Sequence, residues 1–381
     1  VPLVYPPAVI GREVFRAMTW PDGKSIDEPL SRAIRTGWGD GAPELDALLA
    51  ENEPALALLE KIDPAASCEF LAGVEVDFAT AMPHLSASRR LAKVLILLAR
   101  REMAEGKSQE AARHVARVVR LARSVANDHT LISRLIESAM TNLTFTAFSD
   151  LVAGGDEAVR AEIDAAVSAV LRDRLPAADA IAAEERLASG LGKYLSGKWA
   201  NPEFSGPAWD AVKGADDATR ARWQEEYAAV VKDWYARMKS ACAPGRLGQI
   251  DALGSEARDA ESSPDPPRWL FGLMSSALGA GVKSLAKSEA GLVALRVSIA
   301  LRRHRAETGA WAATLDVLVP GRIDVVPADP LDGKPLRYAS EGNACRLWSV
   351  GLDLTDDGGT QQYDDASSED QRGTDLIWEL K

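Results

Sequence analysis

The sequence has few residues that carry redox or covalent chemistry, with only 3 cysteines and 4 histidines among its 381 residues. Cys68, Cys242 and Cys345 lie far apart and show no CxxC spacing. An odd number of distant cysteines cannot complete a disulfide framework, and this spacing excludes the usual structural zinc sites. We therefore expect buried, unpaired thiols.

Motifs of the common enzyme classes are also absent. The sequence has no HExxH zinc motif, no GxSxG nucleophile elbow, no GxxxxGK(S/T) phosphate loop and no GxGxxG fingerprint. The histidines stand singly, and we expect His84, in MPHLS, to cap a helix or to pack in the core. Glu184 and Glu185 would point about 100° apart on a helix, so we expect a solvated face there. We predict no catalytic residue, and the sequence favours a protein that is not an enzyme.

Long apolar runs and excess positive charge are missing as well. No stretch reaches the ~20 apolar residues of a membrane span. With 44 basic and 56 acidic residues the net charge is -12, which repels the phosphates of nucleic acids and anionic lipids. We therefore expect no nucleic-acid partner. The chain begins VPLVYPPAVIG, without a methionine, and a removed signal or membrane anchor is one candidate for what precedes Val1.

Most of the remaining pattern is helical. Residues 1–43 are rich in proline and glycine, and they predict an irregular entry segment with one short helix around residues 26–36. The stretch APELDALLAENEPALALLEKI repeats Leu and Ala at helical intervals and predicts one helix. We expect a first, helical domain over residues 1–267, with its core in residues 44–154.

The clearest pattern is SASRRLAKVLILLARREMAEGKSQEAARHVARVVRLARSVAND, two helical runs broken at Glu105-Gly106-Lys107. Two amphipathic helices joined by a glycine turn form an αα-hairpin, which here resembles a single tetratricopeptide-like unit. No period of about 34 residues recurs, so a regular solenoid is not expected. The apolar stripe consists of Leu91, Val94, Leu95 and Leu98 in the first run and Ala111, Val115, Val118, Val119 and Ala122 in the second.

Residues 216–242 carry an aromatic stripe, with Trp223, Tyr227 and Trp234 at helical spacing. A core role is the favoured interpretation, and a ligand shelf is the alternative. Residues 243–267 end in ESSPDPP and predict an exposed linker, which sets the domain boundary. Residues 268–282 are apolar and interrupted by glycine, which suits either a docking helix or a helix packed between two domains.

The last quarter of the chain has an ordered series of motifs. A long helical pattern precedes ETGAWAATLDVLVP, VPADPLDGKPLRY, LWSVGLDLTDDGG and TDLIWEL. This order resembles the globular domain of type II secretion major pseudopilins. The resemblance implies a long helix, two or three antiparallel strands and a calcium-binding loop. The matching positions are Gly309, Leu315, Leu318, Pro320, Asp329, Pro330, Gly333, Pro335, Tyr338, Ser349, Gly351, Asp353, Gly358, Gly359, Asp375 and Ile377.

The layout of the whole chain is similar to a group of bacterial envelope proteins, common in planctomycetes, that pair a helical domain with such a tail and have no assigned chemistry. The chain departs from pseudopilins because a helical domain stands where they have a hydrophobic assembly helix, so a pilus subunit is not expected. The resemblance implies a place in the cell envelope or periplasm, with a membrane anchor in the full-length protein as one option.

The tail can also be interpreted from its residues alone. Asp329-Pro330 and Asp332-Gly333 supply turn geometry, and PLRYAS and CRLWSVG alternate as half-buried strands do, joined by EGN. The loop that follows is crowded with carboxylates. Ca²⁺ takes six to eight oxygen ligands, and the pattern is not an EF-hand. A solvated acidic loop is the alternative. The candidate calcium ligands are Asp353, Asp357, Asp375 and the carbonyl of Leu352.

We therefore predict a mainly α protein, with an irregular helical domain that contains a tetratricopeptide-like hairpin and a small pseudopilin-like α+β domain over residues 268–381. The first function hypothesis is a non-enzymatic envelope protein that binds a protein or peptide partner on its helical surfaces. The alternative is a hydrolase or carbohydrate-active protein with a site in the cleft between the domains. Its stacking surfaces would be Trp199, Trp209, Trp223 or Trp234.

Overall fold

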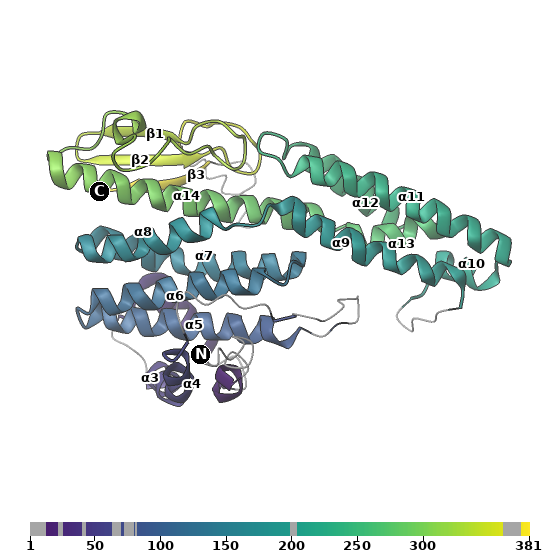
Figure 1. Ribbon diagram of the computed structural model, residues 1–381, viewed down its shortest axis with the longest axis horizontal. Helices are drawn as coiled ribbons and strands as arrows, with labels where there is room; N and C mark the ends of the chain where they lie inside the picture. Colours follow the sequence, from purple (N-terminus) through teal and green to yellow (C-terminus); the bar gives the residue numbers. More distant parts are fainter. Residues whose placement is uncertain are drawn as a thin grey trace, which may run out of the picture.

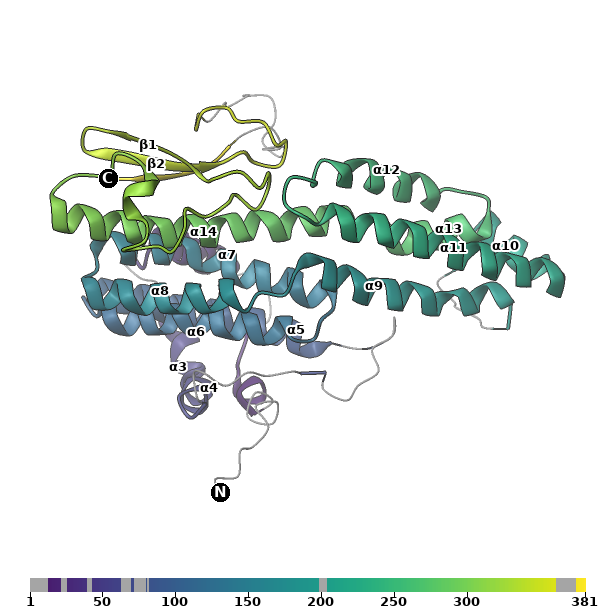
Figure 2. The same cartoon turned by 45° about the horizontal axis from the view of Figure 1, so that its top comes forward.

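The computed structural model describes residues 13–21, 26–39, 43–62, 70–71, 80, 82–198, 204–360 and 375–381. Helices dominate, and one small antiparallel sheet lies near the C-terminal end, which confirms the mainly α class. Figures 1 and 2 show three parts: a body of stacked helices, an arm of helices that projects from one end of the body, and the sheet on one long helix.

The N-terminal helices cover one side of the body. They are α2 (Asp27–Thr36), α3 (Pro43–Glu51) and α4 (Glu53–Leu59). Helix α2 confirms the short helix predicted at residues 26–36. The single helix predicted after it is wrong, because the chain breaks at Asn52. The Asn52 side chain binds the backbone N–H and C=O of Thr19 at 3.1 and 2.9 Å, and Pro54 has no N–H to continue the ladder.

The predicted αα-hairpin forms the centre of the body. Its helices and the two that follow are α5 (Pro83–Ala104), α6 (Ser108–Ala126), α7 (Leu131–Gly154) and α8 (Glu157–Arg172). The predicted stripe is buried, except that Leu98 is half-buried. Residues of α2–α4 cover one face of the hairpin, and residues of α7, α8 and α14 cover the other. The hairpin is therefore enclosed on both faces.

The arm consists of α9 (Ala177–Leu191), the 3₁₀ turn η2 (Gly192–Ser196), α10 (Pro207–Gly214), α11 (Asp217–Ala241), α12 (Gln249–Glu261) and α13 (Pro266–Ser275). The linker predicted over residues 243–267 is wrong, because α12 occupies most of it and buries Ile250, Leu253 and Ala257. These apolar residues recur at helical spacing among Ser, Asp and Glu residues, and this pattern forms the helix.

Helices α12 and α13 cross closely at Gly272. A Cβ built on Gly272 would lie 2.2 Å from the backbone nitrogen of Glu261. A backbone atom cannot rotate away as the end of a side chain can, so only glycine allows this approach. The crossing therefore sets the C-terminal end of α12 against α13.

The sheet packs on α14 (Leu278–Thr308), beyond the short 3₁₀ turn η3 (Leu315–Leu318). Its strands are β1 (Arg337–Glu341), β2 (Ala344–Ser349) and β3 (Leu376–Leu380), antiparallel in the order β1-β2-β3. The hairpin predicted from PLRYAS, EGN and CRLWSVG is confirmed, with Tyr338 opposite Leu347. Cys345 and Leu347 of β2 join the apolar cluster between the sheet and α14.

Helix α14 contributes to three apolar clusters. Val282 joins the arm cluster, Leu292 joins the cluster of α6–α8, and Val297 joins the cluster under the sheet. The arm cluster contains residues from both sides of position 267, such as Trp234 and Phe271. The division into domains at 267 stays a prediction, and tight packing crosses this point.

We expect Gly272→Ala to destabilise the protein, because its methyl group meets the backbone of α12. Overpacking of this kind costs ~1–3 kcal/mol of unfolding free energy, measured by urea titration. Gly190→Ala in α9 is the control, since its Cβ meets no atom within 4 Å, and better helix propensity should add ~0.5–1 kcal/mol. Equal stability of the two variants would contradict the close crossing.

Candidate functional site

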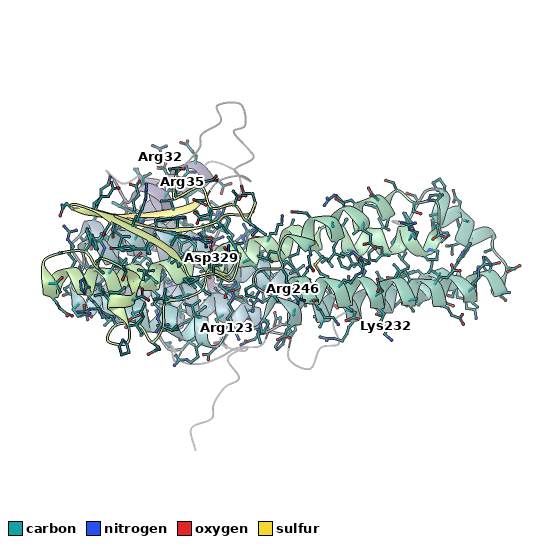
Figure 3. The ribbon with its side chains drawn as sticks, turned by 90° about the horizontal axis from the view of Figure 1, so that it is seen from above. Arg32, Arg35, Arg123, Lys232, Arg246 and Asp329 are labelled. Carbon is teal, nitrogen blue, oxygen red and sulfur yellow. The ribbon has the colours of Figure 1, made fainter. Side chains whose placement is uncertain are left out.

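The DPLDGKP turn is built around the buried carboxylate of Asp329. Figure 3 views it from above, at the end of the sheet nearest to the arm. Among the described residues, the hydrogen bonds to the Asp329 carboxylate come from the turn, from β1, from β2 and from the residue after β2. These bonds explain why a buried carboxylate is tolerated there. The donors are the N–H of Leu331 at 3.0 Å, the Ser349 hydroxyl at 2.8 Å, the N–H of Val350 at 3.1 Å and the Arg337 guanidinium at 2.8 Å.

Arg337 extends this network to the acidic loop. Its guanidinium also donates to Asp332, and its Nε lies 3.2 Å from Asp356. The indole N–H of Trp348 donates to Asp356 at 2.9 Å and lowers the pKa of that carboxyl. These contacts tie the start of the loop to β1 and β2.

The structure brings two of the four predicted calcium ligands together. The backbone N–H of Gly359 donates to Asp375 Oδ2 at 2.7 Å, and Asp375 Oδ1 is buried without a hydrogen bond. Asp375 is 3% exposed. Burial raises the pKa of Asp375, the backbone hydrogen bonds from Gly359 and Asp357 oppose this shift, and the carboxylates of Asp356 and Asp357 add to it. An anionic oxygen in this setting suits a cation.

The other two predicted ligands are placed differently. Asp353 is exposed, and its Oδ1 accepts the N–H of Thr355 at 3.1 Å. The Leu352 side chain packs against the arm cluster, and the role of its carbonyl as a ligand stays a prediction. Across the described part of the chain, no three His, Cys, Asp or Glu side chains are grouped as metal ligands. Calcium binding therefore stays a prediction, and Asp375 is the candidate ligand with a buried oxygen that has no hydrogen bond from the described residues.

His84 takes a core role. Its Nε2 lies 2.6 Å from Asp128 Oδ2, and the other Asp128 oxygen accepts the N–H of Leu71 at 3.1 Å. The ring stacks on Phe70, with 4.8 Å between centroids. The capping alternative is wrong, because Met82 is the N-cap of α5. His84 thus tethers the start of α5 to the turn between α6 and α7.

Glu184 corrects another expectation. Its carboxylate accepts the N–H of Leu131 at 2.9 Å, at the first turn of α7. Burial raises the pKa of Glu184, although this hydrogen bond opposes the shift. Glu185 pairs with Lys239 at 2.6 Å. The solvated face predicted for the two glutamates is wrong for Glu184, which binds an open N–H group of α7.

A buried ion pair lies on α7, and the sequence analysis missed it. Arg134 is 1% exposed and Glu137 is 4% exposed. The Nε of Arg134 lies 3.1 Å from Glu137 Oε2. Burial raises the pKa of Glu137 and lowers that of Arg134. Arg123, labelled in Figure 3, acts electrostatically on both.

The described thiols agree with the expectation of unpaired cysteines. Cys345 is buried and Cys242 is half-buried, and both are free. Burial raises the pKa of Cys242 to about 11, so the nucleophilic thiolate is scarce at neutral pH. Cys68 lies outside the described residues.

The aromatic stripe of α11 belongs to the core, as predicted. Tyr227 and Trp234 are fully buried, and the Trp234 indole donates to the carbonyl of Leu253 at 3.1 Å. Trp209 is also buried, while Trp223 is half-buried against the same cluster. Trp199 lies outside the described residues. Trp209 and Trp234 therefore present no open face to a sugar, which removes them as stacking surfaces of the alternative hypothesis.

An apolar cavity of about 300 Å³ lies on the arm, between the end of α9, residues 204–205 and α13. Phe204 makes edge contacts with Trp269 and Tyr194, each with 5.3 Å between centroids. Leu273 is 38% exposed on the cavity wall, which is unusual for a large apolar residue. The lining residues are Leu191, Phe204, Ser205, Trp269, Leu270, Leu273 and Met274.

A second, more polar cavity of about 180 Å³ adjoins the first. The two share Ser205 and Trp269 in their walls. Glu261 and the hydroxyl residues Ser262 and Ser263, at the end of α12, form its polar side. The close crossing at Gly272 places this end of α12 beside Trp269. We call the two cavities together the arm site.

Only a partial signal for the arm site is present in the sequence. The docking-helix alternative concerned residues 268–282, and α13 does line the cavity with Leu273. The other face of this helix buries Leu270 and Phe271 in the arm, and packing between two domains stays a prediction. Phe204 lies outside the helices, and nothing local in the sequence indicates that it meets Trp269.

Comparison with known proteins found no matching family model, no matching curated protein and no matching solved structure. The resemblance to pseudopilins therefore rests on the residues quoted for it. Among the described residues, none of the helices has both the length and the hydrophobicity that a membrane span requires.

We expect Glu137→Leu to destabilise the protein by ~3–5 kcal/mol, because it leaves the Arg134 guanidinium buried without its carboxylate. The double variant Arg134→Met/Glu137→Leu removes both charges and should recover most of this loss. Urea unfolding at pH 7 measures both. A double variant no more stable than the single one would show that packing, rather than unpaired charge, dominates at this position.

Proposed function

We propose that this protein is a non-enzymatic binding scaffold whose arm site holds an apolar side chain of a protein or peptide partner. The observation that carries the proposal is the solvent-accessible apolar cavity beside Leu273. Its volume of about 300 Å³ fits one large side chain better than a whole cofactor.

The chemistry of the walls favours binding. Phe204, Trp269 and Leu270 provide apolar contact area, and Ser205 is the one polar residue in the lining. A pocket of this kind suits the buried anchor residues that dominate protein interfaces. The buried ion pair of Arg134 and Glu137 lines neither cavity of the arm site. General acid or base chemistry has no partner in the apolar cavity.

Calcium and an envelope location complete the proposal. The unpaired Oδ1 of Asp375 and the neighbouring Asp357 would hold the ion, which would supply positive charge to an otherwise repulsive loop. The long helix under an antiparallel sheet and the Asp329 turn support the pseudopilin-like interpretation of the tail. That interpretation in turn supports the cell envelope, where Ca²⁺ is abundant.

Selection from a library of random seven-residue peptides tests the arm site. We expect enriched peptides to carry a large aliphatic or aromatic residue. Leu273→Asp should weaken their binding at least tenfold, measured by fluorescence anisotropy, because a charge replaces the apolar wall. Ile132→Asp is the matched control, since Ile132 is 45% exposed on α7 and is not among the lining residues. Failure to enrich any peptide, or equal losses in both variants, would refute the arm site as a binding site.

A thermal melt with EDTA and with millimolar Ca²⁺ tests the acidic loop. A ligand at about 100 times its Kd adds ~2.7 kcal/mol to the folded state. We expect Ca²⁺ to raise the melting temperature and Asp375→Asn to abolish the rise, with Mg²⁺ as the control for ionic strength. Asp353→Asn should keep it, because Asp353 is directed to Thr355. If Ca²⁺ leaves the melting temperature unchanged, calcium binding is refuted and the solvated acidic loop is the correct interpretation.

The same loop predicts a pH dependence. The raised pKa of Asp375 means that the folded protein binds this proton more tightly than the unfolded chain does. The ionised carboxylate therefore costs stability above its folded-state pKa, and the cost disappears as the pH falls below its unfolded value. In EDTA, the advantage of Asp375→Asn over the parent protein should shrink as the pH falls through this range. An advantage that is the same at every pH would contradict the shift.

A further inference from the structure

We propose that the partner of the arm site is basic: an extended peptide that places a large apolar side chain in the apolar cavity and a lysine or arginine side chain in the adjoining polar cavity. This inference rests on the proposed function and adds the charge of the partner. It follows from the residues of the second cavity and from the charges of α12.

The polar cavity offers acceptors and no competing cation. Among the described residues, its lining includes Glu261 and the hydroxyl residues Ser205, Ser262 and Ser263, with no lysine, arginine or histidine. An ammonium or guanidinium group donates several hydrogen bonds and accepts none. The acceptors of this cavity therefore match a basic side chain, while a carboxylate would meet Glu261 as a like charge.

Charges near the cavity strengthen this preference. On α12, Asp251 pairs with Lys283 at 2.6 Å, and Glu256 pairs with Arg237 at 2.8 Å. Glu261 forms no ion pair with any residue that the structure describes. Two of the four acidic groups of α12, Asp251 and Glu256, are thus paired locally, while Glu261, in the cavity wall, has no ion pair among the described residues.

The partial charges at the helix ends do not reverse the sign of the electrostatic potential in the polar cavity. The cavity meets the N-terminal end of α10 at Gly206–Ala208 and the C-terminal end of α12 at Glu261. These ends carry opposite partial charges of about half an elementary charge, so their contributions oppose each other. The N-terminal end of α13 lies beside the same wall and is capped by the carboxylate of Asp265, and Glu261 adds a full negative charge to these partial charges. The net charge of -12 adds a long-range attraction for a basic partner.

The positions of the two cavities set the spacing between the apolar residue and the basic residue of the peptide. Both cavities include Trp269 and Ser205 in their walls, so they lie side by side. In an extended peptide, residues i and i+2 point to the same side, about 7 Å apart. One apolar residue and one basic residue separated by a single position can therefore enter the two cavities together.

Three synthetic peptides test the inference, taken from the selected pool and differing at the i+2 position as Lys, Gln or Glu. We expect the Lys peptide to bind about fivefold more tightly than the Gln peptide, and the Glu peptide to bind more weakly than both, in fluorescence anisotropy at low salt. Raising the salt concentration to 0.5 M should shrink these differences, because exposed ion pairs are screened.

Charge reversal gives the sharper measurement. Glu261→Lys should invert the order of the three affinities, so that the Glu peptide binds best. Glu225→Lys is the control, because it makes the same change of net charge on an exposed part of α11. This variant should leave the order of affinities intact. Peptides could bind and lose their binding in Leu273→Asp, while Glu261→Lys leaves the order of the three affinities unchanged. This result would refute the basic partner and would leave the arm site supported. If no peptide binds, both proposals fall.

Discussion

The architecture depends on one helix that is buried along most of its length. Helix α14 has 31 residues, which at 1.5 Å each makes it about 46 Å long. Its apolar residues face three clusters in turn, so the arm, the body and the sheet are all packed on the same rigid axis. Close packing requires small residues: a Cβ at Gly291 would lie 2.5 Å from the ring of Phe145 on α7. Residues 290–301 of α14 are buried apart from the half-buried Arg296, so this part of the helix carries no polar stripe.

This dependence explains where a binding site can form. The body and the sheet bury their apolar faces against α14 and against each other, whereas the arm extends beyond them and must close its own core. Its closure is incomplete beside Phe204 and Leu273, where an apolar cavity stays accessible. The close crossing at Gly272 then brings the acidic end of α12 to the rim. An apolar pocket beside a fixed carboxylate is a consequence of how α12 and α13 pack.

Local pattern predicted the parts of this fold in which residues near in sequence make the contacts. The αα-hairpin and the β1-β2 hairpin each have a turn and a periodic stripe within a few dozen residues, and both are confirmed. Contacts between distant residues defeated the same approach: Asn52 ends a helix because it binds Thr19, and the half-buried Glu184 binds the N–H of Leu131. Helix α12 was mistaken for a linker because its apolar residues are separated by polar ones. The arm site had no local signal beyond α13, because exposed and buried leucines look alike in a sequence.

Two buried aspartates in the tail show why similar residues support different interpretations. The Asp329 carboxylate accepts four hydrogen bonds, from its own turn, from β1, from β2 and from the residue that follows β2. Its charge is therefore fully compensated, and its role is structural. Asp375 is almost as buried, yet its Oδ1 has no hydrogen bond among the described residues, and burial raises its pKa together with the carboxylates of Asp356 and Asp357. The sequence motif contains both residues and does not distinguish them. What distinguishes them is the uncompensated negative charge at Asp375, and a divalent cation is the ligand that would compensate it without rearranging β3.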